Sequence, residues 1–501
     1  MTPYLIVFLI YSGVMVAIGL YANKFSKTFD DYLIGKSTGV GWFFMAITVL
    51  GTQLSGAAFM GTVGSVARNG LSHLVFNSQG FFMAFSLSWI VFAVRLRKLA
   101  DRVELRTVPD LMEARYESKW TRLVYAVVII IGYLPYIGAQ YMGAALLMDA
   151  IFGVPYIVGL LISAIVVGLY MTLGGYLADV WTDTFQGIWM VLVWVIVTPL
   201  LLSRFGGLKS LLQKASTTVP GILSFAGASG FFTRKMAFST FLFALMAGIA
   251  QPASFFRFYS MKKWDDARWG SFTCQAANLW IYFSIMVIGL SARIIVPNLA
   301  QLPGGANYAA LYVARDALPP FVGGLLLVGL MAAMMSTVDG LLLVVSAAVS
   351  RDIYQKMINP HADDKILTKI AMATTAIVSA ASVLVVLNPN AAWLQNILIL
   401  TFLSWGFLGI AFFYPTVVGL YWPKMNSAGA IAGTIAGVVT YVVLWPGIFF
   451  KSYVWGVHPW LPAIISSTIA MLLGVYIGKP NSGRVMEVFF PAYAGTEKGD
   501  N

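Results

Sequence analysis

Long apolar stretches follow one another along nearly the whole chain, and each is long enough to cross a lipid bilayer as a helix. About 20 apolar residues in helical form span the hydrocarbon core. By this criterion the sequence predicts about thirteen spans, near 2–23, 40–67, 71–95, 120–150, 154–174, 178–203, 237–260, 272–296, 320–350, 369–388, 392–420, 428–448 and 460–478. Backbone polar groups in hydrocarbon must be hydrogen-bonded within the chain, which favours helices. We therefore expect an all-α polytopic membrane protein, with residues 1–501 forming a single transmembrane domain.

Composition and motifs exclude several other classes of protein. A soluble domain has about a quarter of its residues charged, whereas here 10% are charged and 59% are hydrophobic. The net charge of +12 has no water-exposed face on which to cluster, so we expect no nucleic-acid partner. His73, His361 and His458 fall in or beside loops and form no zinc-protease motif, and no glycine-rich phosphate loop follows a strand. We therefore expect that the protein is not an enzyme.

The distribution of basic residues predicts which way the chain faces. No Lys or Arg precedes the first span, whereas a secretory signal carries its positive charge before the apolar segment. We therefore expect a retained first helix, an external N-terminus and, after thirteen spans, a cytoplasmic tail at 479–501. With this orientation 23 of the 32 Lys and Arg residues lie on the cytoplasmic side, as the positive-inside rule requires. The expected location is the plasma or inner membrane of the cell.

Four acidic residues fall inside or at the edge of apolar spans, where a charge costs at least about 2.5–3.5 kcal/mol near the helix centre. Asp149 and Asp179 lie near span ends, and we expect both to face water. Asp183 shares a helix face with Asp179 and is either an ion contact or the partner of another side chain. Asp339 has apolar turns on both sides and Ser336 three residues before it. It is a cation contact if those oxygens face an ion; alternatively, the nearby hydroxyls bond to their own helix.

Two predicted spans contain interruptions at similar depths. The span from 40 contains GTQLSGAAFMG, and the span from 237 contains AGIAQPASFFRF, in which Pro252 removes a helical donor. Broken helices at matching positions of two inverted repeats are typical of transporters that couple a solute to Na⁺ or H⁺. Five spans separate the two starts, which predicts a 5+5 inverted repeat. The two copies are 40–203 and 237–420, with one extra helix before them (2–23) and two after them (428–478).

Six motifs in order make the chain similar to the sodium/solute symporter family, especially its proline, pantothenate and monocarboxylate carriers. They are FDDYLIG, TQLSGAAFMG, RTVPDLMEARY, GGYLADVWTDTFQG, AQPASFFRF and AAMMSTVDGLLLVVSAAVSRDIY, between about residues 20 and 440. The resemblance implies a five-plus-five inverted repeat of the leucine-transporter type. It also implies Na⁺-driven import of a small organic solute by alternating access in the lipid bilayer, with Na⁺ as the coupling ion.

The same resemblance implies a sodium site between the first broken helix and the eighth core helix. Matched by motif, the carbonyls of Gly51, Leu54 and Ala333 and the hydroxyls of Ser336 and Thr337 would hold Na⁺. Relatives with a second sodium site pair an acid at the position of Asp183 with hydroxyls at positions that here are Asp339 and Gly340. A second cation site at Asp183 and Asp339 would therefore be built differently here, or the two acids would share a proton.

The solute pocket is expected between the two broken helices and the third core helix. Its predicted residues are Gln53, Ser55, Gly56, Gln79, Tyr133, Tyr136, Gln140, Gln251, Pro252 and Trp405. For the tyrosines and Trp405, ordinary interhelical packing is the alternative. No Lys or Arg is expected in mid-helix at this depth, so a carboxylate solute would be held by half-helix dipoles and amides.

The sequence predicts a transporter, but it leaves several possibilities for the solute and for the coupling ion. Gln and aromatic side chains suit a monocarboxylate, pantothenate or an amino acid such as proline, and the Na⁺:solute ratio stays open. Proton-coupled symport through Asp183 or Asp339 is the nearest alternative mechanism. A channel or facilitator, which needs no cation-specific buried oxygens, and a transporter-like sensor are further alternatives.

Overall fold

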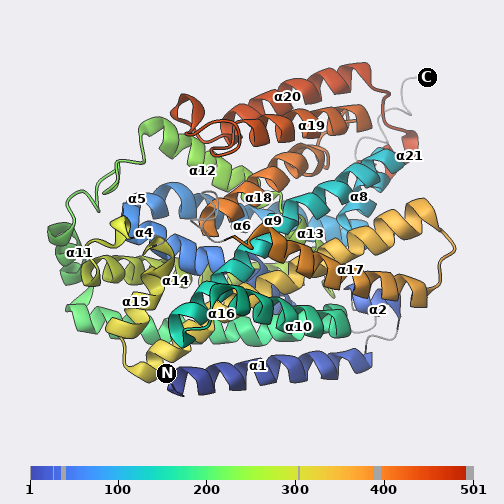
Figure 1. Ribbon diagram of the computed structural model, residues 1–501. Helices are drawn as coiled ribbons and strands as arrows, with labels where there is room; N and C mark the ends of the chain where they lie inside the picture. Colours follow the sequence, from blue (N-terminus) through green and yellow to red (C-terminus); the bar gives the residue numbers. More distant parts are fainter. Residues whose placement is uncertain (1, 26–27, 35–40, 303–304, 389–396, 492–501) are drawn as a thin grey trace.

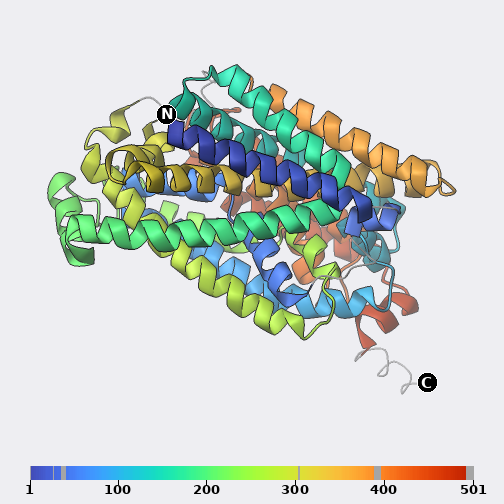
Figure 2. The same ribbon diagram turned by 90° about the horizontal axis from the view of Figure 1, so that it is seen from below.

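The computed structural model describes residues 2–25, 28–34, 41–302, 305–388 and 397–491. These parts of the chain are almost entirely helical and contain no β-sheet, and most long helices run in similar or opposite directions in one bundle (Figures 1 and 2). The long helices are α1 (Thr2–Ala22), α9 (Lys119–Phe152), α10 (Tyr156–Phe205), α14 (Asp266–Ile295), α16 (Pro320–Ala347), α17 (Asp364–Val385), α18 (Ile397–Phe412), α19 (Ser427–Val443) and α20 (Trp460–Ile477).

Shorter helices join into further membrane-length segments or lie between them. The joined helices are α3 (Trp42–Gln53), η2 (Ala57–Thr62) and α4 (Val63–Asn69); α5 (Leu71–His73), η3 (Leu74–Ser78), α6 (Gln79–Ser88), η4 (Trp89–Ala93) and α7 (Val94–Ala100); and α12 (Arg234–Ile249) with α13 (Pro252–Tyr259). Two π-helices, η7 (Ala348–Ile358) and η9 (Phe413–Val418), continue α16 and α18. Short helices between or after the spans are α2 (Phe29–Ile34), α8 (Val108–Tyr116), α11 (Gly207–Thr218), α15 (Ala309–Asp316) and α21 (Gly483–Phe489).

Helices occupy the places of all the predicted spans. The spans predicted at 154–174 and 178–203 are the two parts of α10, which meet at Gly175. Gly175 has φ +60°, and a Cβ there would lie 2.6 Å from the Tyr32 ring, so only glycine fits this kink. The start of the span predicted at 392 and the end of the tail predicted at 479–501 lie outside the described residues.

Counted by length and hydropathy, nine helices of the described residues could each cross a membrane, or ten if the bent pair α3 and η2–α4 is one span. The all-α polytopic class is therefore confirmed, whereas the total of thirteen and the 5+5 repeat stay predictions. The helices outside the predicted repeat lie apart: α1 packs against α10 on one side of the bundle, and α19 and α20 pack together on the other (Figure 1).

A buried ion-pair network joins α8, α9 and η7 at the end of the bundle that carries α21 (Figure 1). Arg351 Nε donates to Asp110 at 2.8 Å, and Arg122 Nη1 contacts Asp110 at 2.7 Å and Asp352 at 2.5 Å. Burial by itself would raise the pKa of Asp110, but the charges of Arg351 and Arg122 outweigh it and hold the pKa below its ordinary value. The network ties the predicted cytoplasmic loop 95–122 to the end of α16.

Candidate functional site

The first broken helix has the predicted interruption. Helix α3 ends at Gln53, Leu54 is non-helical (φ −102°, ψ 85°), and the chain resumes as η2 at Ala57 after a bend of 57°. A Cβ on Gly56 would lie 2.4 Å from Met334 Cγ, so glycine is required where the second half passes α16. The last carbonyls of α3 have no helical amide after them, which leaves backbone oxygens available in the bilayer interior.

The second predicted interruption separates α12 from α13. Gln251 is extended (φ −79°, ψ 120°), and Pro252 begins α13, where its missing N–H costs nothing. The Gln251 amide Nε2 donates to the Ala247 carbonyl at 2.7 Å and to the Trp405 carbonyl at 3.3 Å. Gln251, which the sequence placed in the solute pocket, therefore caps the end of α12 in this structure.

Helix α9 supports both breaks with one face. Gln140 Oε1 accepts from the Gly56 amide at 2.9 Å, and Tyr133 Oη accepts from the Ala253 amide at 3.0 Å. Tyr136 lies between them on the same face, with its ring 6.0 Å from the Trp405 ring. The shared face is as predicted, but Tyr133 and Gln140 bind the backbone at the start of each second half-helix. They are positioning residues in this structure.

Replacing Gln140 by leucine is expected to destabilise the first break. The change leaves the buried Gly56 amide without an acceptor, which costs about 1–3 kcal/mol. Thermal unfolding of the purified protein would show the loss as a lower Tm. Tyr141→Phe is the matched control, because it removes a buried hydrogen bond to Ser379 on α17, 2.7 Å long and away from either break. Weaker solute binding in Gln140→Leu but not in Tyr141→Phe would support the role of Gln140 in holding the first break. Equal loss of solute binding in both variants would contradict that role.

A small cavity lies beside the first break. Its volume is about 30 Å³, room for one or two water molecules, so an organic solute needs its walls to move apart. Its lining includes five buried groups without a hydrogen-bond partner among the described residues: Gln53 Nε2, Asn77 Nδ2, Ser78 Oγ, Thr401 Oγ1 and Trp405 Nε1. Such groups each cost free energy unless a ligand or water satisfies them.

Three of the predicted solute residues, Gln53, Ser55 and Trp405, line this cavity. Gln79 does not, because it is exposed on the opposite face of α6, and its neighbours Asn77 and Ser78 line the cavity instead. Sequence reasoning missed Asn77, Ser78 and Thr401. A signal was present for the first: Asn77, Phe81 and Phe85 recur every four residues and so share one helix face.

The five predicted sodium ligands come from two helices that pack against each other. A Cβ on Gly51 would lie 3.7 Å from Ser336 Oγ, and all five residues are buried. The hydroxyls of Ser336 and Thr337 donate to the Ala333 carbonyl at 3.2 and 3.0 Å, the back-bonding that was the alternative to ion binding. Their lone pairs stay available, because a donating hydroxyl keeps its acceptor sites. This donor set of carbonyl and hydroxyl oxygens suits a hard cation such as Na⁺.

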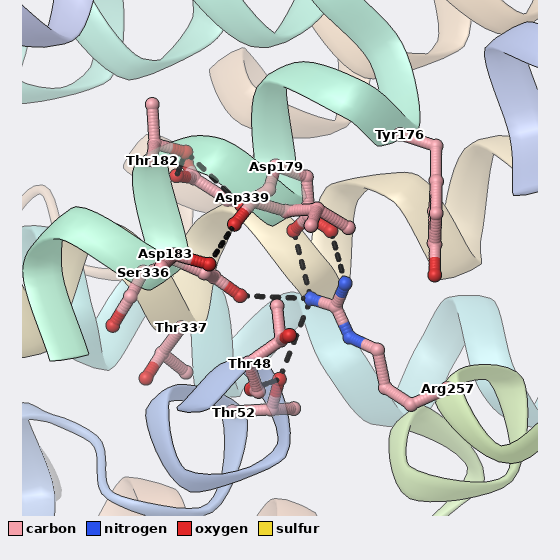
Figure 3. Close-up of polar contacts among 12 residues, drawn as sticks. Thr48, Thr52, Tyr176, Asp179, Thr182, Asp183, Arg257, Ser336, Thr337 and Asp339 are labelled. Atoms are coloured by element: carbon pink, nitrogen blue, oxygen red, sulfur yellow. Dashed lines mark hydrogen bonds and ion pairs between the residues drawn. The ribbon is translucent and has the colours of Figure 1, made fainter. Parts of the chain in front are cut away.

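A buried arginine, which sequence reasoning missed, pairs with acidic residues beside the predicted sodium ligands (Figure 3). Arg257 on α13 is 2% exposed and pairs with both carboxylate oxygens of Asp179, one of them at 2.9 Å from Nη2. The same Nη2 lies 2.9 Å from Asp183 Oδ2. Asp179 is therefore buried and paired, and the expectation that it faces water is wrong. The expectation that no basic residue lies at this depth is also wrong.

A sequence signal for Arg257 existed. It follows Pro252 by five residues, so it lies within the second half-helix, and two acids four residues apart on another span require a buried partner. Asp183 keeps one oxygen, Oδ1, without a partner, and the Asp183 Cγ lies 3.9 Å from where a Gly51 Cβ would be. Asp183 is thus a partner of Arg257 on one side, while its free oxygen lies in the neighbourhood of the predicted sodium ligands.

Asp339 is separate from that ion pair. Tyr170 Oη lies 2.6 and 2.7 Å from its two oxygens, and Thr182 Oγ1 donates to Oδ2 at 3.3 Å. Asp339 is fully buried, and no ion pair joins it to a cation in the described parts of the chain. Its carboxyl is held by hydroxyls of α10, not by Arg257.

Comparison with known proteins identifies the family. The model of the sodium:solute symporter family matches residues 31–437. The sodium/pantothenate symporter of Escherichia coli is 28% identical (93% of this chain, 95% of that protein), and the sodium/proline symporter of the same organism is 27% identical (98% and 97%). A Na⁺-coupled sialic acid symporter, solved substrate-bound and outward-open, has the same fold with a TM-score of 0.79 at 18% identity, covering 96% of this chain and 99% of that one. The chain belongs to the sodium:solute symporter family, and it is a multi-pass membrane transporter that couples Na⁺ to a small organic solute.

Proposed function

We propose that this protein imports a small organic carboxylate or zwitterion, such as a monocarboxylate, pantothenate or proline, with Na⁺ by alternating access. The observation that carries the proposal is the cavity beside the first break, whose buried polar groups lack partners among the described residues. Gln53 Nε2 and Asn77 Nδ2 are amide donors suited to a carboxylate. Phe81, Phe85 and Trp405 supply apolar walls for the rest of the solute. The relatives' names, sodium/proline and sodium/pantothenate symporter, support this class of solute.

The proposed sodium site comprises the carbonyls of Gly51, Leu54 and Ala333 and the hydroxyls of Ser336 and Thr337. Asp183 supplies negative charge next to it through its unpaired Oδ1. Arg257 already provides the positive charge that a second cation at Asp179 and Asp183 would provide, so we expect one Na⁺ per solute. Asp339, which has no cationic partner in the described parts of the chain, is the alternative proton or second cation site.

We infer an external N-terminus and a cytoplasmic tail in the cell membrane. Helix α1 begins at one end of the bundle and α21 lies at the other (Figure 1), as an odd number of spans requires. The basic residues of 95–122 lie at the α21 end, in agreement with the positive-inside rule.

Thermal stability of the purified protein tests the proposal. L-proline, pantothenate, pyruvate and propionate are each added in Na⁺ and in K⁺. A ligand that binds the native state raises the free energy of unfolding by mass action, by roughly 2.7 kcal/mol at a ligand concentration of one hundred times its Kd. The Tm rises accordingly. We expect one of these compounds to stabilise the protein in Na⁺ and not in K⁺. Equal stabilisation in both salts that varies with pH would instead favour proton coupling through Asp339.

A further inference from the structure

A groove at the end of the bundle that carries α21 combines basic and apolar surface. It has a volume of about 350 Å³, within the range of small-molecule sites. It lies between η4 with α7, the turn that follows η9, and the end of α21. This basic groove is lined, beside the residues of α21, by Ile90, Val94, Arg95, Lys98, Arg102 and Tyr421.

The three cations of the basic groove recur at helical spacing. Arg95 and Lys98 are three residues apart on α7, and Arg102 follows four residues later in the next turn, so the three lie along one face. Neither Asp nor Glu is among the described residues that line the groove, and no salt bridge there joins any of the three to an acid. By contrast, Arg97, which does not line the groove, pairs with Asp101 at 2.7 Å.

Two of these cations contact the end of α21 and keep donors to spare. Arg95 Nη2 donates to the Phe489 carbonyl at 2.9 Å, and Arg102 Nη1 donates to the Val488 carbonyl at 3.4 Å. The Arg95 guanidinium also lies over the Tyr421 ring, 4.3 Å from its centroid, and its Nε has no hydrogen-bond partner among the described residues. Because a guanidinium carries five N–H donors in one plane, both side chains can still bind an anion.

A second cavity at the same end differs in its balance of charge. It has a volume of about 480 Å³ and shares with the basic groove the wall formed by α21. Its arginines Arg122 and Arg351 pair with Asp110, and Arg351 also lies 3.3 Å from Glu104. The positive charge of that cavity is neutralised within the protein. The basic groove has no such acids in its lining, so its charge is best neutralised by an anion from outside the chain.

The position of the groove indicates that this anion belongs to a lipid. Helix α7 ends the helical segment Leu71–Ala100, which is long and apolar enough to cross a membrane, so cations at its end lie at the level of lipid headgroups. Ile90 lines the groove about two turns before Lys98 and is 72% exposed, which gives the groove an apolar wall toward the hydrocarbon. Trp264, whose ring centroid is 4.6 Å from Lys98 Nζ, is exposed at the same level, as is typical of tryptophan at membrane interfaces.

We propose that the basic groove binds one anionic phospholipid. Its phosphate contacts Arg95, Lys98 and Arg102, and an acyl chain lies along Ile90. We infer this end of the bundle to be cytoplasmic, and the cytoplasmic leaflet is the one with negative surface potential. The inference goes beyond the proposed function, because the groove shares no lining residue with the small cavity beside the first break, the central cavity. The bound headgroup connects α7 to α21, since two of its ligands already hold the last carbonyls of α21.

Native mass spectrometry of the delipidated full-length protein tests the site, with phosphatidylglycerol as the probe and phosphatidylcholine of the same acyl chains for comparison. We expect one phosphatidylglycerol to bind more tightly than any further copies, and phosphatidylcholine to show no such tight equivalent. Lys98→Gln with Arg102→Gln should weaken the tight equivalent by roughly thirtyfold, since each basic residue near an anionic lipid surface contributes about 1 kcal/mol. Both residues are exposed, so the folded state is retained.

Lys262→Gln with Lys424→Gln is the matched control, because it removes two exposed cations of the proposed cytoplasmic side that do not line the groove. It should keep the tight equivalent at native affinity. Absence of a tight equivalent, its full retention in Lys98→Gln with Arg102→Gln, or an equal loss in the control would each overturn the site. Displacement of the lipid by inorganic phosphate, in place of chloride at matched ionic strength, would show a site for free phosphate, and the assignment to a lipid would be wrong.

Discussion

Replacing Ser336 and Thr337 together by alanine is expected to raise the Na⁺ concentration for half-maximal solute binding by roughly 30-fold to 150-fold. Each hydroxyl supplies one oxygen to the proposed sodium site, and the loss of two such contacts at about 1–1.5 kcal/mol each gives that factor. Solute affinity at saturating Na⁺ should change little, because neither residue lines the central cavity. Solute-induced stabilisation measured across a Na⁺ titration gives both quantities.

Ser346→Ala is the control for this experiment. Ser346 is a buried serine of the same helix that donates to a carbonyl of its own helix, at 2.9 Å, ten residues beyond Ser336. It should leave the Na⁺ requirement unchanged. If the double alanine variant binds solute with the native Na⁺ requirement, the hydroxyls serve only their own helix and the sodium site lies elsewhere.

Replacing Arg257 by alanine is expected to destabilise the folded protein severely. It leaves Asp179 and Asp183 without a positive partner in the interior, and removing one partner of a buried ion pair costs about 3–5 kcal/mol. Arg257 also connects two parts of the transport machinery, since it lies on the helix that follows the second break and pairs with an acid beside Gly51. We expect a large fall in Tm together with weaker coupling between Na⁺ and solute binding.

Two further variants show whether Arg257→Ala loses stability through unpaired charges or through lost side-chain packing. Asp179→Asn combined with Arg257→Gln removes one charge of each sign, so that only Asp183 keeps a buried charge without a positive partner. This double variant should recover part of the stability that Arg257→Ala loses. Arg204→Ala changes an exposed arginine whose guanidinium donates to the Asp316 and Ala317 carbonyls, and surface changes of this kind stay within about 0.5 kcal/mol. If the double variant is as unstable as Arg257→Ala, the ion pairs are not the reason for the burial of Arg257.

The residues of the proposed sodium site could be named from the sequence because they belong to local motifs. Gly51 and Leu54 belong to one interrupted segment, and Ser336 and Thr337 are neighbours on one helix, so matching two short motifs sufficed. The residues of the solute pocket were harder to predict from the sequence. Gln53, Ser55 and Trp405 line the cavity, but Gln79 points away from it and Gln140, Tyr133 and Gln251 bind backbone groups at the breaks. Which of several polar residues on a helix faces a cavity depends on the rotation of that helix in the bundle.

The membrane class, the places of the helices, the two interruptions and the family could all be predicted from the sequence, because each depends on runs of residues that are contiguous in the chain. The pairing of Arg257 with Asp179 and Asp183 and the isolation of Asp339 among hydroxyls required the tertiary structure. Residues 74 to 78 positions apart meet in the ion pair. From the sequence of one span, a charge near its end is expected to face water. Whether the charge is buried instead depends on which groups of other helices replace water around it, and only the tertiary structure gives those groups.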